Sequence, residues 1–213
     1  MEFEEFKHKI VKIKKMKLPG ESAQFKMAPK ERINELKKIA DVKKSAKKAG
    51  VLALFYPSVS KQTMLALILR KTYKGVHSAQ IGFPGGKFEA MDITLRVTAL
   101  RETEEEIGVN QNKVIVLKKL TEVYIPPSNF FVQPFLGYTN KTPNFILQED
   151  EVEDLIEVPL KHFMNDSIKS FQNLSTSYAK NIEVPVFNLN NHRVWGATAM
   201  MLSEVREILK QLL

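Results

Sequence analysis

The apolar residues of the chain fall into short runs that are typical of buried strands, separated by polar turns. Val51 to Tyr56 and Met64 to Arg70 are compact apolar runs on either side of the turn-like segment Pro57-Ser58-Val59-Ser60, so each run predicts one strand. Similar runs predict further strands at Val114 to Tyr124, at Phe130 to Tyr138, at Glu151 to Val158 and, as two short strands, between Val184 and Val194.

Apolar residues at spacings of three and four predict helices in the remaining segments. One helix is expected from Leu95 to Ile107, closed by Gly108, and another from Ala197 to Leu213. The first 20 residues predict a short strand or helix that ends at Pro19-Gly20. An amphipathic basic helix is expected to follow and to stop at Gly50.

The order of these elements predicts the architecture. Strands around a central helix, with a further helix at the end of the chain, favour an α/β sandwich with a mixed sheet. A chain of 213 residues is long enough for one domain with a full core. We therefore expect residues 1–50 to form an N-terminal extension, packed on a main domain that covers residues 51–213.

Composition narrows the classes of protein that the chain can belong to. The absence of cysteine excludes disulfides, thiolate metal sites and thiol nucleophiles. No apolar run approaches the length of about 20 residues that a membrane span needs, so we expect no membrane partner. The start MEFEEFKHKI lacks the basic patch and apolar stretch of a secretory signal, which predicts a cytoplasmic protein.

The formal charge of +8 fits either nucleic acid or a small anionic substrate. Much of the excess lies between Lys30 and Lys48, where apolar residues recur at helical spacing and no aromatic residue interleaves the lysines. We interpret this segment as a helix with a solvated basic face, and nucleic acid is the less favoured partner. The sequence leaves open whether the chain forms a homodimer.

The stretch from Gly82 to Val109, GFPGGKFEAMDITLRVTALRETEEEIGV, contains the candidate chemistry. Glu102, Glu105 and Glu106 stand at i, i+3 and i+4, so their carboxylates lie on one face of the expected helix. Acid-rich helices are often only solvated surfaces. A hard cation such as Mg²⁺ or Mn²⁺ would remove the repulsion and prefers carboxylate oxygen.

The same stretch resembles the Nudix box, G-x5-E-x7-R-E-U-x-E-E-x-G-U, in which U is aliphatic. The positions that fit are Gly86, Arg101, Glu102, Glu105, Glu106, Gly108 and Val109. Two positions depart from it: Asp92 replaces the first Glu with one extra residue before Arg101, and Thr103 replaces the first aliphatic residue. Asp92 either supports Arg101 or is an acid that favours the start of the helix.

This resemblance implies a Nudix-type α/β/α sandwich and a metal-dependent pyrophosphatase. Mg²⁺ or Mn²⁺ would be bound by Glu102, Glu105 and Glu106, with the backbone carbonyl of Gly86 as a further ligand. Arg101 would orient the carboxylates. The general base would be Glu105 or Glu151, and for Glu151 a solvated-surface role is an equal alternative.

Within that superfamily the chain resembles the coenzyme A pyrophosphatase branch. The segments that carry the likeness include Phe83-Pro84-Gly85-Gly86, Thr98-Ala99-Leu100-Arg101-Glu102 and Trp195-Gly196-Ala197-Thr198-Ala199. Such enzymes split coenzyme A, or its acyl derivatives, into adenosine 3',5'-bisphosphate and 4'-phosphopantetheine. The upstream signature of the branch keeps its first arginine as Arg70, whereas Lys71, Gly75 and Ala79 depart from it.

Residues near this signature are the candidates for binding the small anionic nucleotide-containing substrate. They are Arg70, Lys71, Lys74 and His77, and a structural or solvated role is the alternative for His77. Two other functions stay open. One is a Nudix pyrophosphatase for another nucleoside diphosphate derivative such as ADP-ribose. The other is a catalytically silent nucleotide- or nucleic-acid-binding module, against which the intact glutamates argue.

Overall fold

A computed structural model describes residues 1–29, 33, 45–71, 80–174 and 181–213. Among these residues, eight strands form one mixed sheet whose main path is β3-β2-β1-β7-β5, with β4 on β1, β6 on β7 and β8 on β2. Its strands are β1 (Lys47–Pro57), β2 (Thr63–Arg70), β3 (Ile81–Gly82), β4 (Gly85–Lys87), β5 (Val114–Lys119), β6 (Val123–Ile125), β7 (Phe130–Thr139) and β8 (Val152–Pro159). β1 and β7 run parallel, and the other pairs are antiparallel.

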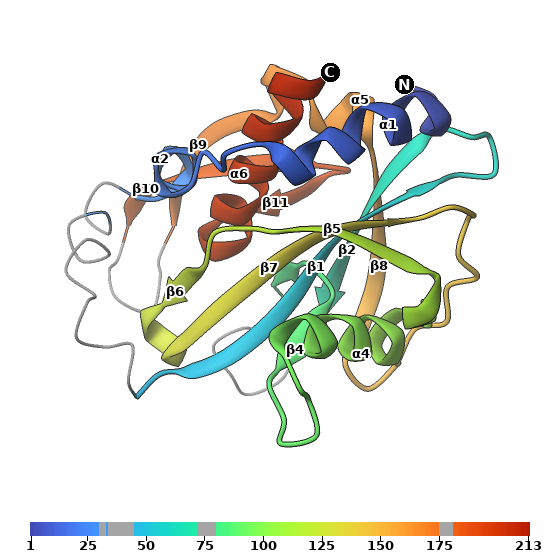
Figure 1. Cartoon of the computed structure of the whole chain (residues 1–213). Coiled ribbons are helices and arrows are strands. Elements are labelled where there is room, and N and C mark those ends of the chain that lie inside the picture. The colour runs from blue at the N-terminus through green and yellow to red at the C-terminus, as the bar shows by residue number, and fades with distance from the viewer. Residues whose placement is uncertain (30–32, 34–44, 72–79, 175–180) are drawn as a thin grey trace.

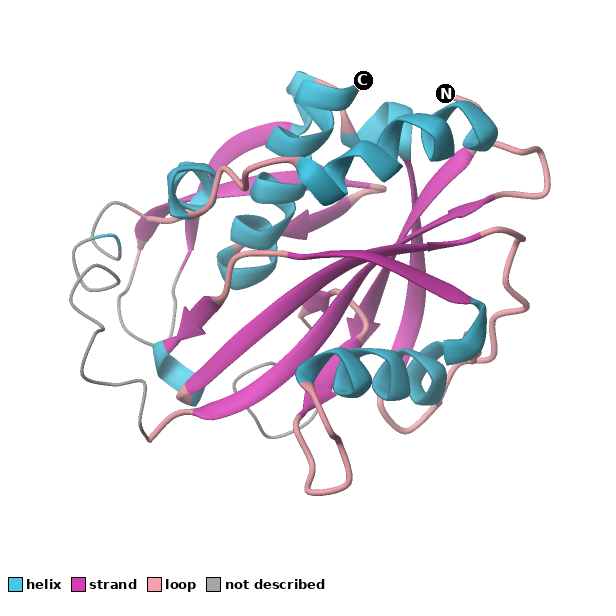
Figure 2. Ribbon diagram, viewed as in Figure 1, coloured by secondary structure: helices cyan, strands magenta, loops and turns pink. Residues whose placement is uncertain are grey.

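Helices cover both faces of this sheet (Figures 1 and 2). On one side lies α4 (Leu95–Ile107), and on the other lie α1 (Phe3–Ile10) and α6 (Gly196–Leu212). A smaller sheet, β9 (Lys169–Leu174), β10 (Ile182–Leu189) and β11 (His192–Val194), lies beside α6. The short helical segments are η1 (Val11–Lys15), α2 (Glu21–Gln24), η2 (Phe25–Met27), η4 (Gln111–Lys113), η5 (Pro126–Ser128), α5 (Leu160–Phe163) and η6 (Asp166–Ile168).

The alternation of β1 explains why the sheet is covered on both faces. Leu52 and Leu54 belong to the core cluster that contains Ala99 and Ile107 of α4. Ala53 and Phe55 belong to the cluster on the opposite face, with residues of α1 and α6. Because successive side chains of a strand point to opposite faces, a continuous apolar run needs cover on both. The α/β/α sandwich expected from the sequence is confirmed.

The boundaries of α4 follow from local chemistry. Thr94 is its N-cap, and its hydroxyl accepts a hydrogen bond from the Val97 amide at 3.3 Å. Gly108 ends the helix in the left-handed region, with φ 72°. A side chain at Gly50 of β1 would collide with the Leu95 carbonyl, so glycine at this position allows the helix to pack closely on the sheet. This helix has the predicted bounds.

Two segments differ from the sequence prediction. The basic helix was expected to continue to Gly50, but Lys47 to Gly50 are the first residues of β1, because they pair with both β4 and β7. Most of the remaining basic segment, including Lys43 and Lys44, lies outside the described residues. The strand expected from Val114 to Tyr124 is divided into β5 and β6, which both pair with β7.

The sequence analysis also did not predict β9, whose residues alternate between exposed and half-buried. Within the part of the chain that the structure describes, no helix is both long and apolar enough to cross a bilayer.

Candidate metal centre and active site

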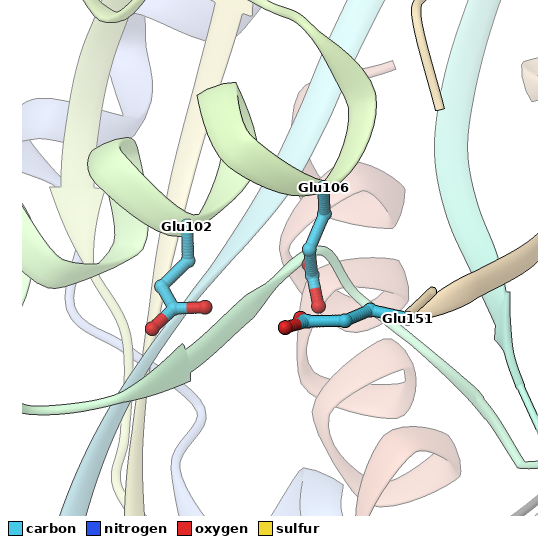
Figure 3. Close-up of side chains that lie close together, drawn as sticks. All are labelled: Glu102, Glu106 and Glu151. Atoms are coloured by element: carbon cyan, nitrogen blue, oxygen red, sulfur yellow. The ribbon is translucent and has the colours of Figure 1, made fainter. Parts of the chain in front are cut away.

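Three carboxylates converge where α4 meets the start of β8. Glu102 and Glu106 project from successive turns of α4, and Glu151 comes from the segment just before Val152 of β8 (Figure 3). Each offers one oxygen, and these oxygens lie within 4.8 Å of one another. The structure therefore brings together two of the three predicted helix ligands and the later glutamate.

The glycine turn between β3 and α4 allows the backbone to approach these carboxylates. The Gly85 amide donates a hydrogen bond of 2.7 Å to Glu106 Oε2, and Gly85 has φ 140°, where a side chain would be strained. A Cβ at Gly86 would collide with the carboxylate of Glu102. Both glycines of the turn are thus needed for the close packing of backbone on carboxylates.

Arg70 borders the cluster from the end of β2. Its Nη2 donates a hydrogen bond of 2.6 Å to the Gly85 carbonyl, and its Nη1 lies 2.9 Å from Glu106 Oε1. The latter contact is an ion pair without aligned hydrogen-bond geometry, so Glu106 Oε1 is a buried acceptor without a hydrogen bond among the described residues. A buried acceptor of this kind is unfavourable unless another positive partner binds it.

Lys71 acts on the backbone that carries Glu151. Its amide donates to the Glu151 carbonyl at 2.9 Å, and its Nζ donates to the Glu149 carbonyl at 2.6 Å. Lys71 therefore fixes the turn before β8, which the sequence did not predict. Lys74 and His77, the other candidates for substrate contact, lie outside the described residues.

Burial makes the charged form of the inner carboxylates costly. It raises the pKa of Glu106 to about 7; the neighbouring Glu102 and Glu151 add to this rise, whereas Arg70 and the Gly85 amide oppose it. Burial also raises the pKa of Glu102, and Arg101 opposes that shift. Three carboxylates, one of which has a buried oxygen without a hydrogen bond among the described residues, fit a hard divalent cation, which would stabilise their charged forms.

Arg101 connects the cluster to the loop before α4. Its Nε and Nη2 each lie 3.0 Å from the carboxylate of Asp92, and Nη2 also lies 3.0 Å from Glu102 Oε1. Asp92 is buried and accepts further hydrogen bonds from the Thr98 hydroxyl and the Glu89 amide. These contacts, chiefly the one with Arg101, lower the pKa of Asp92 to about 2. Of the two roles considered for Asp92, support of Arg101 is the one that these contacts match.

Glu105 lies apart from the cluster. Its side chain is 57% exposed, and its carboxylate lies 2.7 Å from Arg101 Nη1. The i, i+3, i+4 spacing predicts that Glu105 lies beside Glu102 and Glu106, but its carboxylate is paired with the guanidinium of Arg101 and does not join the cluster. Its assignment as a metal ligand or as the general base stays a prediction.

Comparison with known proteins identifies the family. A family model described as "NUDIX domain" matches residues 46–175, more than half of the 213 residues. The chain therefore belongs to the Nudix family and is a Nudix pyrophosphatase; hydrolases of this family act on small nucleotide substrates. Nudix hydrolases generally need a divalent metal ion, which agrees with the chemistry of the carboxylate cluster.

Two of the relatives carry the name coenzyme A diphosphatase. The chain is 28% identical over 178 residues to the peroxisomal coenzyme A diphosphatase ndx-8 of Caenorhabditis elegans, covering 80% of this chain and 74% of the relative. It is 30% identical over 136 residues to the human mitochondrial coenzyme A diphosphatase NUDT8, covering 63% of this chain and 58% of the relative. One of these relatives is named as peroxisomal and the other as mitochondrial. The cytoplasmic location expected for this chain therefore stays a prediction.

Solved structures support the fold. The Nudix hydrolase RenU of Mycobacterium smegmatis matches with a TM-score of 0.54 and 14% identity, covering 79% of this chain and 88% of that one. The Nudix domain of Shewanella oneidensis NrtR, solved in complex with ADP ribose, matches with a TM-score of 0.50 and 16% identity, covering 83% and 97%. Identities this low show a common fold and carry no conclusion about the substrate.

Proposed function

We propose that the chain hydrolyses the central pyrophosphate of coenzyme A or its acyl derivatives, giving adenosine 3',5'-bisphosphate and 4'-phosphopantetheine. The observation that carries the proposal is the cluster of Glu102, Glu106 and Glu151 beside Arg70. The likeness to two proteins named coenzyme A diphosphatases supports the choice of substrate.

The cation of this proposal is Mg²⁺ or Mn²⁺, held chiefly by Glu102 and Glu106. Gly86, whose backbone packs against Glu102, offers the further carbonyl ligand. When bound, the cation neutralises phosphate charge while water attacks in line. Arg101 fixes the position of Glu102 through their 3.0 Å contact, which would keep the Glu102 carboxylate available to the cation.

Glu151 is assigned as the general base that accepts the proton of the attacking water. Its side chain is the exposed member of the cluster, whereas Glu106 is buried and paired with Arg70. An exposed carboxylate can pass a proton to solvent without the cost of a buried charge. Lys71 keeps this base in place through the hydrogen bond from its amide to the Glu151 carbonyl. Arg70, which borders the cluster, is the cation that would face the phosphates of the substrate.

The test is product analysis with purified full-length protein. Coenzyme A, dephospho-coenzyme A, ADP-ribose and a nucleoside triphosphate are each incubated with Mg²⁺ or Mn²⁺, and the products are separated by chromatography. We expect adenosine 3',5'-bisphosphate and 4'-phosphopantetheine from coenzyme A, and no product with excess chelator. Rapid cleavage of ADP-ribose alone would establish a different Nudix specificity. Nucleotide binding without cleavage of any of these substrates would overturn the proposal.

A variant pair tests the assignment of the base. Glu151→Gln should lower kcat while Mn²⁺ binding, measured by calorimetry, stays within a few-fold of the wild type. Glu106→Gln should weaken Mn²⁺ binding itself. Loss of Mn²⁺ binding in Glu151→Gln would make Glu151 a principal ligand and return the general base to Glu105.

A further inference from the structure

The loop between β4 and α4 exposes two large apolar side chains. Met91 is 73% exposed and Ile93 is 88% exposed, whereas Asp92 between them is only 4% exposed. Residues 88–94 project from the body of the molecule below α4 (Figure 1). Single exposed apolar residues are common on protein surfaces, but here two of them flank one buried anchor.

The anchor holds both apolar side chains outward. Asp92 accepts hydrogen bonds from Arg101, Thr98 and the Glu89 amide, and its own amide donates to the Glu89 carbonyl at 3.0 Å. With Asp92 fixed in this way, the side chains of Met91 and Ile93 are left exposed to solvent. Retracting Met91 or Ile93 into the protein would therefore break contacts of a buried carboxylate, which is costly.

Three exposed cationic residues lie near the ends of this loop. Lys87 directly precedes it, and Arg96 lies in the first turn of α4. Lys48 is brought beside it because the Phe88 amide donates to the Lys48 carbonyl at 2.9 Å. All three side chains belong to exposed residues. Glu89 contributes one exposed acid, and the charge of Asp92 is compensated by Arg101.

We propose that this loop docks the protein on an anionic lipid bilayer, with Met91 and Ile93 inserted at the boundary between headgroups and acyl chains. Two apolar side chains bury far less than the roughly 1,000 Å² that a specific protein interface requires. A bilayer accepts such a small apolar tip, and its phosphates complement the positive charges of Lys48, Lys87 and Arg96 near the ends of the loop.

This proposal goes beyond the proposed function and does not depend on it. The expectation of no membrane partner rested on the length of apolar runs, which concerns spans and not docking from the surface. Because Asp92 of the loop is bound to Arg101, and Arg101 contacts Glu102, docking would set the carboxylate cluster at a fixed orientation to the bilayer.

The experiment is sedimentation of the full chain with vesicles of phosphatidylcholine, with and without phosphatidylserine. We expect binding to the mixed vesicles that weakens as salt is raised. The double variant Met91→Ser/Ile93→Ser should lower the partition coefficient at least tenfold. The variant Lys48→Gln/Lys87→Gln/Arg96→Gln should remove the preference for phosphatidylserine. The unfolding temperature of each variant checks that the fold is intact.

Val59→Ser is the matched control. Val59 is 92% exposed and follows the opposite end of β1, on the turn to β2, so its loss should leave vesicle binding unchanged. Equal binding by the wild type and the Met91/Ile93 variant, or no binding by the wild type, would overturn the proposal. So would a wild-type dimer that this variant dissociates in the absence of vesicle binding, because the loop would then contact a second copy of the chain.

Discussion

At the scale of single residues, the site depends on which carboxylates are buried and which are paired with arginine. Glu106 is 1% exposed and contacts the Gly85 amide and Arg70, whereas Glu105 is exposed and contacts Arg101. Adjacent glutamates of the same motif thus have different surroundings. Their substitution should have different effects.

We predict that Glu106→Gln removes most of the catalytic activity. A metal ion contributes several kcal/mol to charge stabilisation in such reactions, so kcat should fall by about 10²-fold or more. Glu105→Gln should leave Mn²⁺ binding closer to that of the wild type, because its carboxylate lies against Arg101. Calorimetric titration with Mn²⁺ and initial rates measure both effects. Wild-type turnover in Glu106→Gln would be incompatible with the assigned metal centre.

Arg70 gives a second prediction, because its guanidinium lies where it competes with a cation for Glu106. With Nη1 at 2.9 Å from Glu106 Oε1, Arg70→Ala should tighten Mn²⁺ binding several-fold in the absence of substrate. It should also raise KM for coenzyme A, since a positive group facing the phosphates is lost. Arg70→Lys keeps the charge and is the control. Weaker Mn²⁺ binding in Arg70→Ala would mean that the hydrogen bond from Arg70 to the Gly85 carbonyl supports the metal centre more than the charge of Arg70 repels the cation.

At the scale of elements, the buried Asp92 links the loop to α4. The pKa of Asp92 is lowered to about 2 in the folded state, from an ordinary value of 3.8. Asp92 therefore stabilises the fold fully above pH 3.8, and this contribution is lost as the pH falls through the range from 3.8 to about 2. The shift corresponds to about 2 kcal/mol.

We predict that Asp92→Asn lowers the free energy of unfolding by about 2 kcal/mol at neutral pH. The difference from the wild type should shrink as the pH falls from 3.8 to about 2, because protonation then removes the same charge from the wild type. Urea unfolding at several pH values measures this, with Asp150→Asn, at an exposed position, as the control. A difference that stays constant over this pH range would contradict a charge-based role.

Comparison of the elements also shows how far local sequence determines the structure. The bounds of α4 were predictable because Thr94 and Gly108 act on their immediate neighbours. The start of β1 was not, because Lys47 and Lys48 are exposed and acquire strand geometry by pairing with β7, more than 80 residues later. Short-range patterns identify helix ends, whereas pairing across the sheet decides where strands begin.

The candidate site likewise combines residues that local sequence predicts with residues that distant contacts bring into place. Glu102 and Glu106 could be predicted from helical spacing and the family resemblance. Glu151 could be named only as one alternative, because its place depends on the pairing of Arg70 with Val152 and on the backbone contact with Lys71. The separation of Glu105 from the cluster follows from Arg101, whose side chain contacts Asp92, Glu102 and Glu105 together. Spacing along the helix alone does not reveal that Arg101, and not a shared cation, would hold Glu105.

At the scale of the whole molecule, the formal charge of +8 favours association with substrates that carry several phosphates. If this field and the cations near Arg70 contribute to recognition, the 3'-phosphate of coenzyme A should increase kcat/KM over dephospho-coenzyme A. Each exposed contact contributes about 1 kcal/mol or less, so the preference should be several-fold per contact. The preference should decline as salt is raised.

This last prediction is tested with variants that separate local from distant charge. Lys74→Gln should reduce the preference for coenzyme A, because Lys74 belongs to the candidate substrate-binding group. Lys71→Gln should act mainly on kcat for both substrates, because its Nζ binds the Glu149 carbonyl and thereby fixes the turn before β8. Lys43→Gln/Lys44→Gln removes two charges from the basic segment that we interpret as a solvated face, so hydrolysis should not change. Equal kcat/KM for the two substrates in the wild-type protein would exclude recognition of the 3'-phosphate. If the preference for coenzyme A fell equally in all three variants, the net charge of the protein and not the position of each lysine would govern it.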